Sequence, residues 1–229
     1  MKYLKRLAVV LEVSSTVSDY RIFIMRKLIS FCLLGAFATA THAQNPLENW
    51  STLKVKGSLS ENIELAIEGE HRYNHDEDYT RYFHTDFGII YKLSDKFKVG
   101  GFLREIYELK SDVRVREVRP HVDLVYKATS NIKVRCRTEY QIKEFSDNKL
   151  RIRLRPTYSL KLNEKLTPYI QTEVFFVGTS LVRNRLNPGI SISVHENMSI
   201  APGFILESNF KNEVWSHINI LWVAATVKF

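Results

Sequence analysis

The sequence predicts an all-β protein, a transmembrane antiparallel up-and-down β-barrel of about 10–12 strands. Three observations predict this fold. Apolar and polar residues alternate with a period of two, turn-like clusters recur about every 34 residues, and the chain ends on an alternating apolar segment at 221–229. A mean hydropathy of -0.19, without an apolar run of about 18 residues beyond the first 40, excludes a polytopic helical membrane protein.

The alternation is clear in the segment 131–143. One face carries Ile132, Val134 and Cys136, while the other carries mostly charged residues. Segments 83–93 and 150–162 repeat the pattern. Because successive side chains of a β-strand point to opposite faces, each segment is predicted to be a strand with one apolar and one polar face.

Turn-like clusters centred near residues 60, 95, 130, 164 and 197 divide the chain into hairpins. They delimit eleven segments: 47–58, 62–73, 80–93, 96–109, 115–127, 131–143, 149–162, 165–177, 182–194, 198–208 and 214–229. Bacterial single-chain barrels have even strand numbers, so we expect either that 47–58 does not span, leaving ten strands, or that a further segment completes twelve.

The connections between hairpins look longer and more charged than the turns within them. These connections are 74–80, 110–116, 144–149, 178–184 and 208–214. Tight turns alternating with longer loops are typical of outer-membrane barrels, whose tight turns face the periplasm.

The first 43 residues are predicted to be a targeting segment. Residues 25–43 combine a basic start, an apolar stretch and small residues before Gln44, as in a secretory signal peptide cut after Ala43. Residues 1–24 are interpreted as an upstream extension of the start, and 44–229 as the barrel. Six of the 33 Lys and Arg residues and two of the 25 Asp and Glu residues precede the cut, so half of the net charge of +8 belongs to the leader.

A soluble periplasmic barrel or binding protein is an alternative, because soluble barrels also alternate. The length of the segments and the aromatic C-terminal residue favour a membrane barrel. Prolines in the predicted strands argue against an unbroken hydrogen-bond ladder, since proline has no backbone N–H to donate. Pro156 and Pro188 therefore predict bulges or ends of hydrogen bonding.

Three stretches carry a resemblance to a known family. They are RIRLRPTYSLKLNEKL at 151–166, EVFF at 173–176 and NRLNPG at 184–189. From about Trp50 to Phe229 the chain resembles domain-of-unknown-function family 2490 (DUF2490), predicted bacterial outer-membrane β-barrel proteins. The resemblance implies a barrel in the outer membrane and implies no activity.

With the apolar face in lipid, the charged face would line the barrel lumen. The predicted lumen-lining residues are Lys133, Arg135, Arg137, Glu139, Arg151, Arg153, Arg155 and Glu173, and Lys161 is expected beside them. Paired charges in a narrow barrel would form a structural polar core. The clustering of basic residues on two neighbouring strands, with acidic residues near 61–70, instead favours a small anion-attracting pore.

A hydrolase with a site at the extracellular rim is the remaining alternative. Residues 75–78 place one histidine beside three acidic residues in one predicted loop. The sequence has no HExxH motif, nucleophile elbow or paired histidines at metal-binding spacing, so we predict no catalytic, metal or cofactor-binding residue and no cofactor. Nucleic-acid binding is not expected, because the basic residues alternate within strands of an exported protein.

The expected partners follow from the outer-membrane location. We expect contacts with the lipid bilayer and lipopolysaccharide, and recognition by the barrel-insertion machinery through the last strand ending in Phe229. Aromatic residues near strand ends, such as Tyr91, Tyr126 and Tyr158, are typical of an interfacial belt. We expect a monomer.

Overall fold

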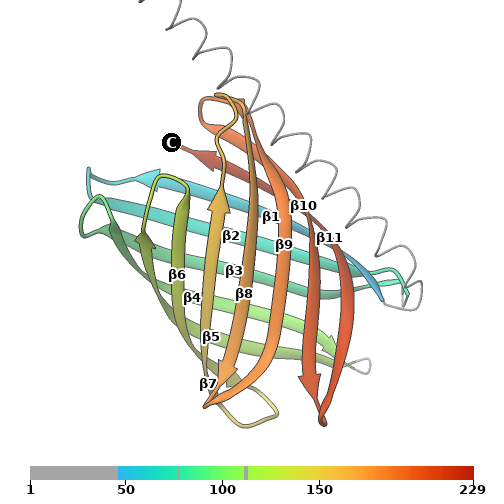
Figure 1. The fold of residues 1–229 in the computed structure, drawn as a ribbon. Coiled ribbons are helices and arrows are strands. Elements are labelled where there is room, and N and C mark those ends of the chain that lie inside the picture. Colours follow the sequence, from blue (N-terminus) through green and yellow to red (C-terminus); the bar gives the residue numbers. More distant parts are fainter. Residues whose placement is uncertain (1–45, 77, 111–112) are drawn as a thin grey trace, which may run out of the picture. The chain divides into compact units, whose positions relative to one another are not determined.

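The computed structural model describes residues 46–76, 78–110 and 113–229. Its strands form a single closed sheet (Figure 1). The predicted extension 1–24 and signal peptide 25–43 lie outside the described residues. No helix in the described part of the chain could cross a membrane. The strands are β1 (Leu47–Ser58), β2 (Ile63–Asn74), β3 (Tyr79–Lys92), β4 (Phe97–Lys110), β5 (Val113–Lys127), β6 (Ile132–Lys143), β7 (Lys149–Ser159), β8 (Leu166–Val177), β9 (Ser180–His195), β10 (Met198–Lys211) and β11 (Val214–Lys228).

The alternation of residues in the sequence places one set of side chains on the outer surface of the barrel and the other set in its interior. In β3, the side chains of Phe87 and Ile89 are 53% and 50% exposed on the outer surface, whereas His84 and Asp86 are 0% and 4% exposed. The apolar face therefore points out and the polar face points in. This arrangement is the reverse of a water-soluble barrel, whose interior is filled by apolar side chains.

Strand β1 closes the barrel by pairing with β2 in antiparallel and with β11 in parallel orientation. The parallel register runs from Leu47 opposite Asn219 to Lys56 opposite Lys228. A ring in which every neighbouring pair is antiparallel needs an even number of strands, so eleven strands close only with one parallel pair. The predicted range of about 10–12 strands is therefore confirmed, but the expectation of an even number was wrong, because all eleven segments are barrel strands among the described residues.

The hairpin connections gather at two rims. The C-terminal rim holds the connections 59–62, 93–96, 128–131, 160–165 and 196–197 together with Phe229. Among the described residues, the N-terminal rim holds 75–76, 78, 144–148, 178–179 and 212–213 together with the start of β1. Connections span two to six residues at the first rim and two to five at the second. The predicted contrast between tight turns and long loops was wrong, because the strands extend into the charged segments.

Three prolines interrupt strand pairing on one side only. Pro120, Pro156 and Pro188 pair with β4, β6 and β8, respectively. Pairing with the following strand stops beside each proline and resumes in the same register, because proline cannot donate to the ladder. The predicted breaks in hydrogen bonding at Pro156 and Pro188 are present without a register shift. The register shifts lie elsewhere, such as between Phe175 and Phe176.

Candidate functional site

The barrel interior contains two adjoining cavities. The larger cavity has a volume of 690 Å³ and extends from the N-terminal rim, where Glu48 and Ser216 line it. The smaller cavity has a volume of 320 Å³ and lies toward the C-terminal rim. Both cavities are lined by five charged residues near mid-barrel, which are Lys54, Glu68, Arg135, Arg137 and Arg155.

One wall of the interior is built mainly from arginines on β6, β7 and β9. They occupy alternate positions, so they share the inward face of each strand; they are Arg135, Arg137, Arg151, Arg153, Arg155, Arg183 and Arg185. The register places Arg135 directly opposite Arg155, and Arg137 opposite Arg153. Like charges directly opposite each other destabilise a sheet, so this wall depends on interleaved carboxylates.

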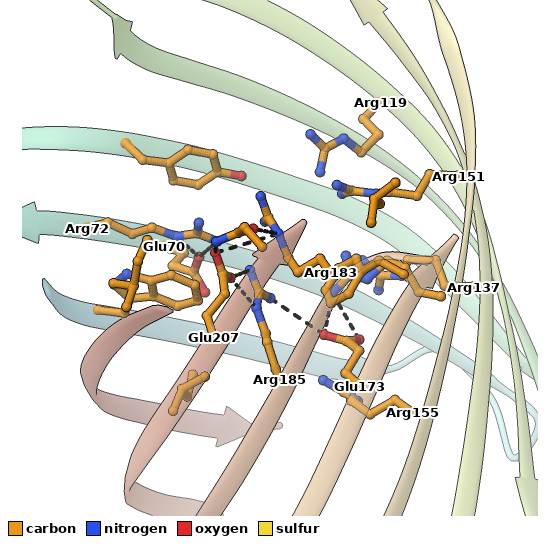
Figure 2. A pocket seen from close by; sticks show the side chains of 18 of the residues that line it. Glu70, Arg72, Arg119, Arg137, Arg151, Arg155, Glu173, Arg183, Arg185 and Glu207 are labelled. Atoms are coloured by element: carbon orange, nitrogen blue, oxygen red, sulfur yellow. Dashed lines mark hydrogen bonds and ion pairs between the residues drawn. The ribbon is translucent and has the colours of Figure 1, made fainter. Parts of the chain in front are cut away.

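Glu173 on β8 forms ion pairs with three arginines. Its Oε1 lies 2.9 Å from Arg135 Nη2, and its Oε2 lies 2.9 Å from Arg153 Nη2 and 3.5 Å from Arg185 Nη1. Figure 2 shows Glu173 to the right of Arg185, with Arg155 next to it. One buried carboxylate therefore joins guanidinium groups from three strands.

Glu139 has the same role on β6, and its side chain is almost fully buried. It accepts a hydrogen bond from Arg151, and its Oε2 lies 3.3 Å from Arg153 Nη1. Its Oε1 lies 3.8 Å from Arg119 Nη1. The two carboxylates Glu139 and Glu173 are thus linked through Arg153, which forms ion pairs with both.

Asp123 and Glu207 complete the pairing at the two sides of this wall. Asp123 accepts two hydrogen bonds from Arg137, at 2.6 Å from Nε and 2.7 Å from Nη2. Glu207 accepts one from Arg185 Nε at 2.6 Å, and its Oε1 lies 3.6 Å from Arg183 Nε. Such charge-assisted bonds hold guanidinium groups in fixed orientations.

Aromatic rings inside the larger cavity support the arginines. The guanidinium carbon of Arg72 lies 3.6 Å from the centroid of the Trp50 ring and 4.0 Å from that of Tyr82. The buried ring of Phe175 lies 4.7 Å from Arg153 and 4.9 Å from Arg185, measured to the guanidinium carbons. Stacking on a ring leaves the N–H edge of a guanidinium group available for polar contacts.

The opposite wall, on β2 to β4, carries more carboxylates than the arginine wall does. Glu68 Oε2 lies 3.0 Å from Lys54 Nζ, and Glu68 Oε1 lies 3.2 Å from Arg104 Nη2. Glu68, His84 and Asp86 present possible metal-ligating atoms within 4.8 Å of one another. Arg104 Nη2 also lies 2.6 Å from Asp86 Oδ2, so a cationic side chain already neutralises both carboxylates of this group.

The structure places the eight lumen residues named from the sequence on the inward face. Arg135, Arg137 and Arg155 line both cavities, Lys133 lines the smaller one, and Arg151, Arg153 and Glu173 line the larger one. Glu139 lies against the arginines, as described above. Lys161, expected beside them, is instead exposed in the connection 160–165, because β7 ends at Ser159.

Sequence reasoning missed the inward aromatic residues Trp50, Tyr82 and Phe175. Their positions could have revealed them, since each lies two residues from an inward charged or polar residue on its strand: Glu48, His84 and Glu173, respectively. The period-two pattern therefore contains this information, but an aromatic residue on a polar face was not recognised as part of the interior.

The segment 75–78, considered for a hydrolase site, makes local contacts in its described residues. The Tyr73 hydroxyl donates to Asp78, and the Asp76 backbone N–H donates to Asn74 Oδ1 at 2.9 Å. The ring of His75 lies edge-on to that of Tyr73, with centroids 5.1 Å apart. These contacts stabilise the rim connection and bring no nucleophile to the histidine.

Comparison with known proteins gives a family and two similar folds. The chain is similar to a NanC porin structure, with 14% identity, a TM-score of 0.47, and coverage of 75% of this chain and 91% of that chain. It is also similar to a KdgM porin structure, with 13% identity, a TM-score of 0.48, and coverage of 80% and 99%. No protein with a curated description matches the chain. The profile of DUF2490, described as a protein of unknown function, matches residues 47–217, and the chain belongs to this family.

Proposed function

We propose that the protein is an outer-membrane β-barrel that forms a narrow, anion-selective pore. The observation that carries this proposal is the arginine wall, because it lines two adjoining cavities inside a closed barrel whose outer surface is apolar. Predominantly positive charge along a pore attracts anions and repels cations.

The outer surface supports insertion into a bilayer. Large apolar side chains cover it, including Phe87 on β3, Leu103 on β4, Val122 on β5 and Leu221 on β11, each more than half exposed. An apolar surface of this extent is costly in water and is stable against hydrocarbon. Closure of the sheet also leaves none of the described strands with an unpaired edge in the lipid.

Exposed aromatic side chains lie near both rims. Phe97 and Tyr126 stack at the C-terminal rim with centroids 4.8 Å apart, and Phe210 and Trp215 contact each other at the N-terminal rim with centroids 5.1 Å apart. On β4, Phe97 and Tyr107 are separated by ten residues. A rise of about 3.3 Å per residue and a tilt of about 40° give a height of about 25 Å between them, which matches the apolar band of outer-membrane barrels.

The interior carries an excess of positive charge. Fifteen Lys and Arg residues and seven Asp and Glu residues line the larger cavity. Seven Lys and Arg residues and four Asp and Glu residues line the smaller cavity. Some cationic side chains therefore have no carboxylate among the described residues to neutralise them. A structural polar core would be neutral, whereas this excess of positive charge would attract anionic solutes.

Reconstitution tests the pore directly. The purified barrel, extracted in detergent, should migrate differently on gels with and without boiling and should produce discrete current steps in planar bilayers. A folded barrel that produces no steps would support the structural-barrel alternative. Recovery of the native protein from the periplasm in water-soluble form would overturn the membrane location as well.

A further inference from the structure

The strongest local imbalance of charge lies where the two cavities adjoin. The β6–β7 register places Lys133 opposite Thr157 and Arg135 opposite Arg155. All four side chains line the smaller cavity, and the two arginines also line the larger one. They therefore form one compact group on the inward surface, which we call the junction cluster.

The cations of the junction cluster outnumber their carboxylate partners. Arg135 shares Glu173 with Arg153, while Lys133 and Arg155 form no ion pair with the described residues. Arg135 Nη1 reaches Asp123 only at 3.6 Å, and Asp123 already accepts two hydrogen bonds from Arg137.

The other carboxylates around the smaller cavity are occupied as well. Glu64 Oε1 lies 2.5 Å from Lys98 Nζ, and Glu64 Oε2 lies 3.8 Å from Lys56 Nζ. Glu68 is paired with Lys54 and Arg104. No carboxylate lining this cavity is therefore left to neutralise Lys133 and Arg155.

The junction cluster also contains hydrogen-bond donors without acceptors. Arg135 Nε, Arg155 Nε and Thr157 Oγ1 are buried atoms that have no hydrogen-bond partner in the described part of the chain. Thr157 as a residue is only 6% exposed. Buried donors are nearly always satisfied in folded proteins, and a cluster of unsatisfied donors beside unpaired cations indicates a missing acceptor with negative charge.

We propose that the junction cluster binds a compact oxyanion, the carboxylate or phosphate group of a small solute. The guanidinium groups of Arg135 and Arg155 offer N–H edges suited to two oxygens of one such group. Lys133 adds a point charge, and the Thr157 hydroxyl adds one donor. The site deepens the proposed pore by naming its solute class, and it rests on that proposal only in requiring that solutes enter the cavities.

Binding is tested on the full barrel folded in detergent. Its thermal unfolding is followed by gel mobility during titration with sodium phosphate or sodium acetate, with sodium chloride at equal ionic strength as the reference. We expect saturable protection by phosphate or acetate that chloride does not give. Equal protection by all three salts, or no saturable protection, would overturn the site.

Matched variants locate the binding. Arg155→Gln and Lys133→Gln should each weaken phosphate or acetate binding at least about tenfold, because each removes a cation that lines the site. Arg155→Lys keeps the charge but loses the planar fork, so it should bind with intermediate affinity. Lys96→Gln, in the exposed connection 93–96, should bind as the original protein does. Undiminished binding by folded Arg155→Gln and Lys133→Gln would overturn the assignment.

The pore and the oxyanion site would be contradicted by different results. Saturable binding without current steps would retain the oxyanion site and overturn the pore. Current steps without saturable binding would retain the pore and overturn the site. Should Arg155→Gln not fold, Lys133→Gln and Arg155→Lys still decide the matter, since both can be compared with the original barrel.

Discussion

The ring of Phe229 lies over Gly57 on the outer surface, across the pairing of the last strand with the first. A Cβ atom on Gly57 would lie 2.6 Å from Cε2 of that ring. Backbone hydrogen bonds join Phe229 to the residues on either side of Gly57, since Phe229 N donates to Lys56 O at 3.0 Å and Ser58 N donates to Phe229 O at 3.1 Å. The C-terminal residue therefore completes the closed barrel, and a side chain at position 57 would displace it.

Substitution at Gly57 should weaken this closure. Gly57→Val forces the Phe229 ring away, and overpacking of this kind costs about 1–3 kcal/mol. Gly101→Val is the matched control, because Gly101 lies in a strand with open space where a Cβ would be. We expect Gly57→Val to unfold at lower urea concentration than Gly101→Val in detergent. Equal unfolding midpoints would show that the ring does not need the glycine.

Cysteine cross-linking should detect the parallel pairing of β1 and β11. Ser51 lies opposite Val223 in this register, and both side chains are exposed on the outer surface. In a Cys136→Ala background, Ser51→Cys with Val223→Cys should form a disulfide on mild oxidation, seen as a mobility shift on non-reducing gels. Ser51→Cys with Ala224→Cys is the control, because Ala224 points inward and should not cross-link. Equal cross-linking of both pairs would contradict the register.

Removal of Glu173 should destabilise the arginine wall. Glu173→Gln leaves the guanidinium groups of Arg135, Arg153 and Arg185 without their shared carboxylate. Loss of one partner from a buried ion pair costs about 3–5 kcal/mol, so the free energy of unfolding should fall by about that amount.

Two further variants check the cause of that loss. Glu61→Gln, in the exposed connection 59–62, should leave the free energy of unfolding unchanged. Combining Glu173→Gln with Arg135→Gln should recover part of the lost stability, since one uncompensated cation is removed. A double variant less stable than Glu173→Gln alone would argue against charge repulsion as the cause.

The strand positions were predictable because they depend on a local property. Alternation of side chains along the segments 80–93 and 131–143 sets which face is apolar, and β3 and β6 match these segments to within one residue at either end. The inward placement of residues such as Arg137 and Arg153 follows from the same alternation along their strands.

The remaining features depend on contacts between distant segments. The parallel pairing of Leu47 with Asn219 is a consequence of closure, which no local pattern encodes. Similarly, the sequence indicates that Glu173 and Arg135 face inward but not that they meet, since their contact depends on the register and curvature of the three strands β6 to β8. The loop lengths were misjudged because charged residues near strand ends, such as Arg114 and Arg116, continue the strand rather than end it.

Ion selectivity tests the central claim most directly. The reversal potential of the reconstituted barrel is measured across a planar bilayer with a potassium chloride gradient, for the original protein and for Arg153→Glu, which reverses one charge of the wall. The arginine-lined interior predicts a reversal potential with the sign of chloride selectivity, shifted toward potassium by Arg153→Glu. A reversal potential with the sign of potassium selectivity in the original protein, or one unchanged by Arg153→Glu, would contradict it.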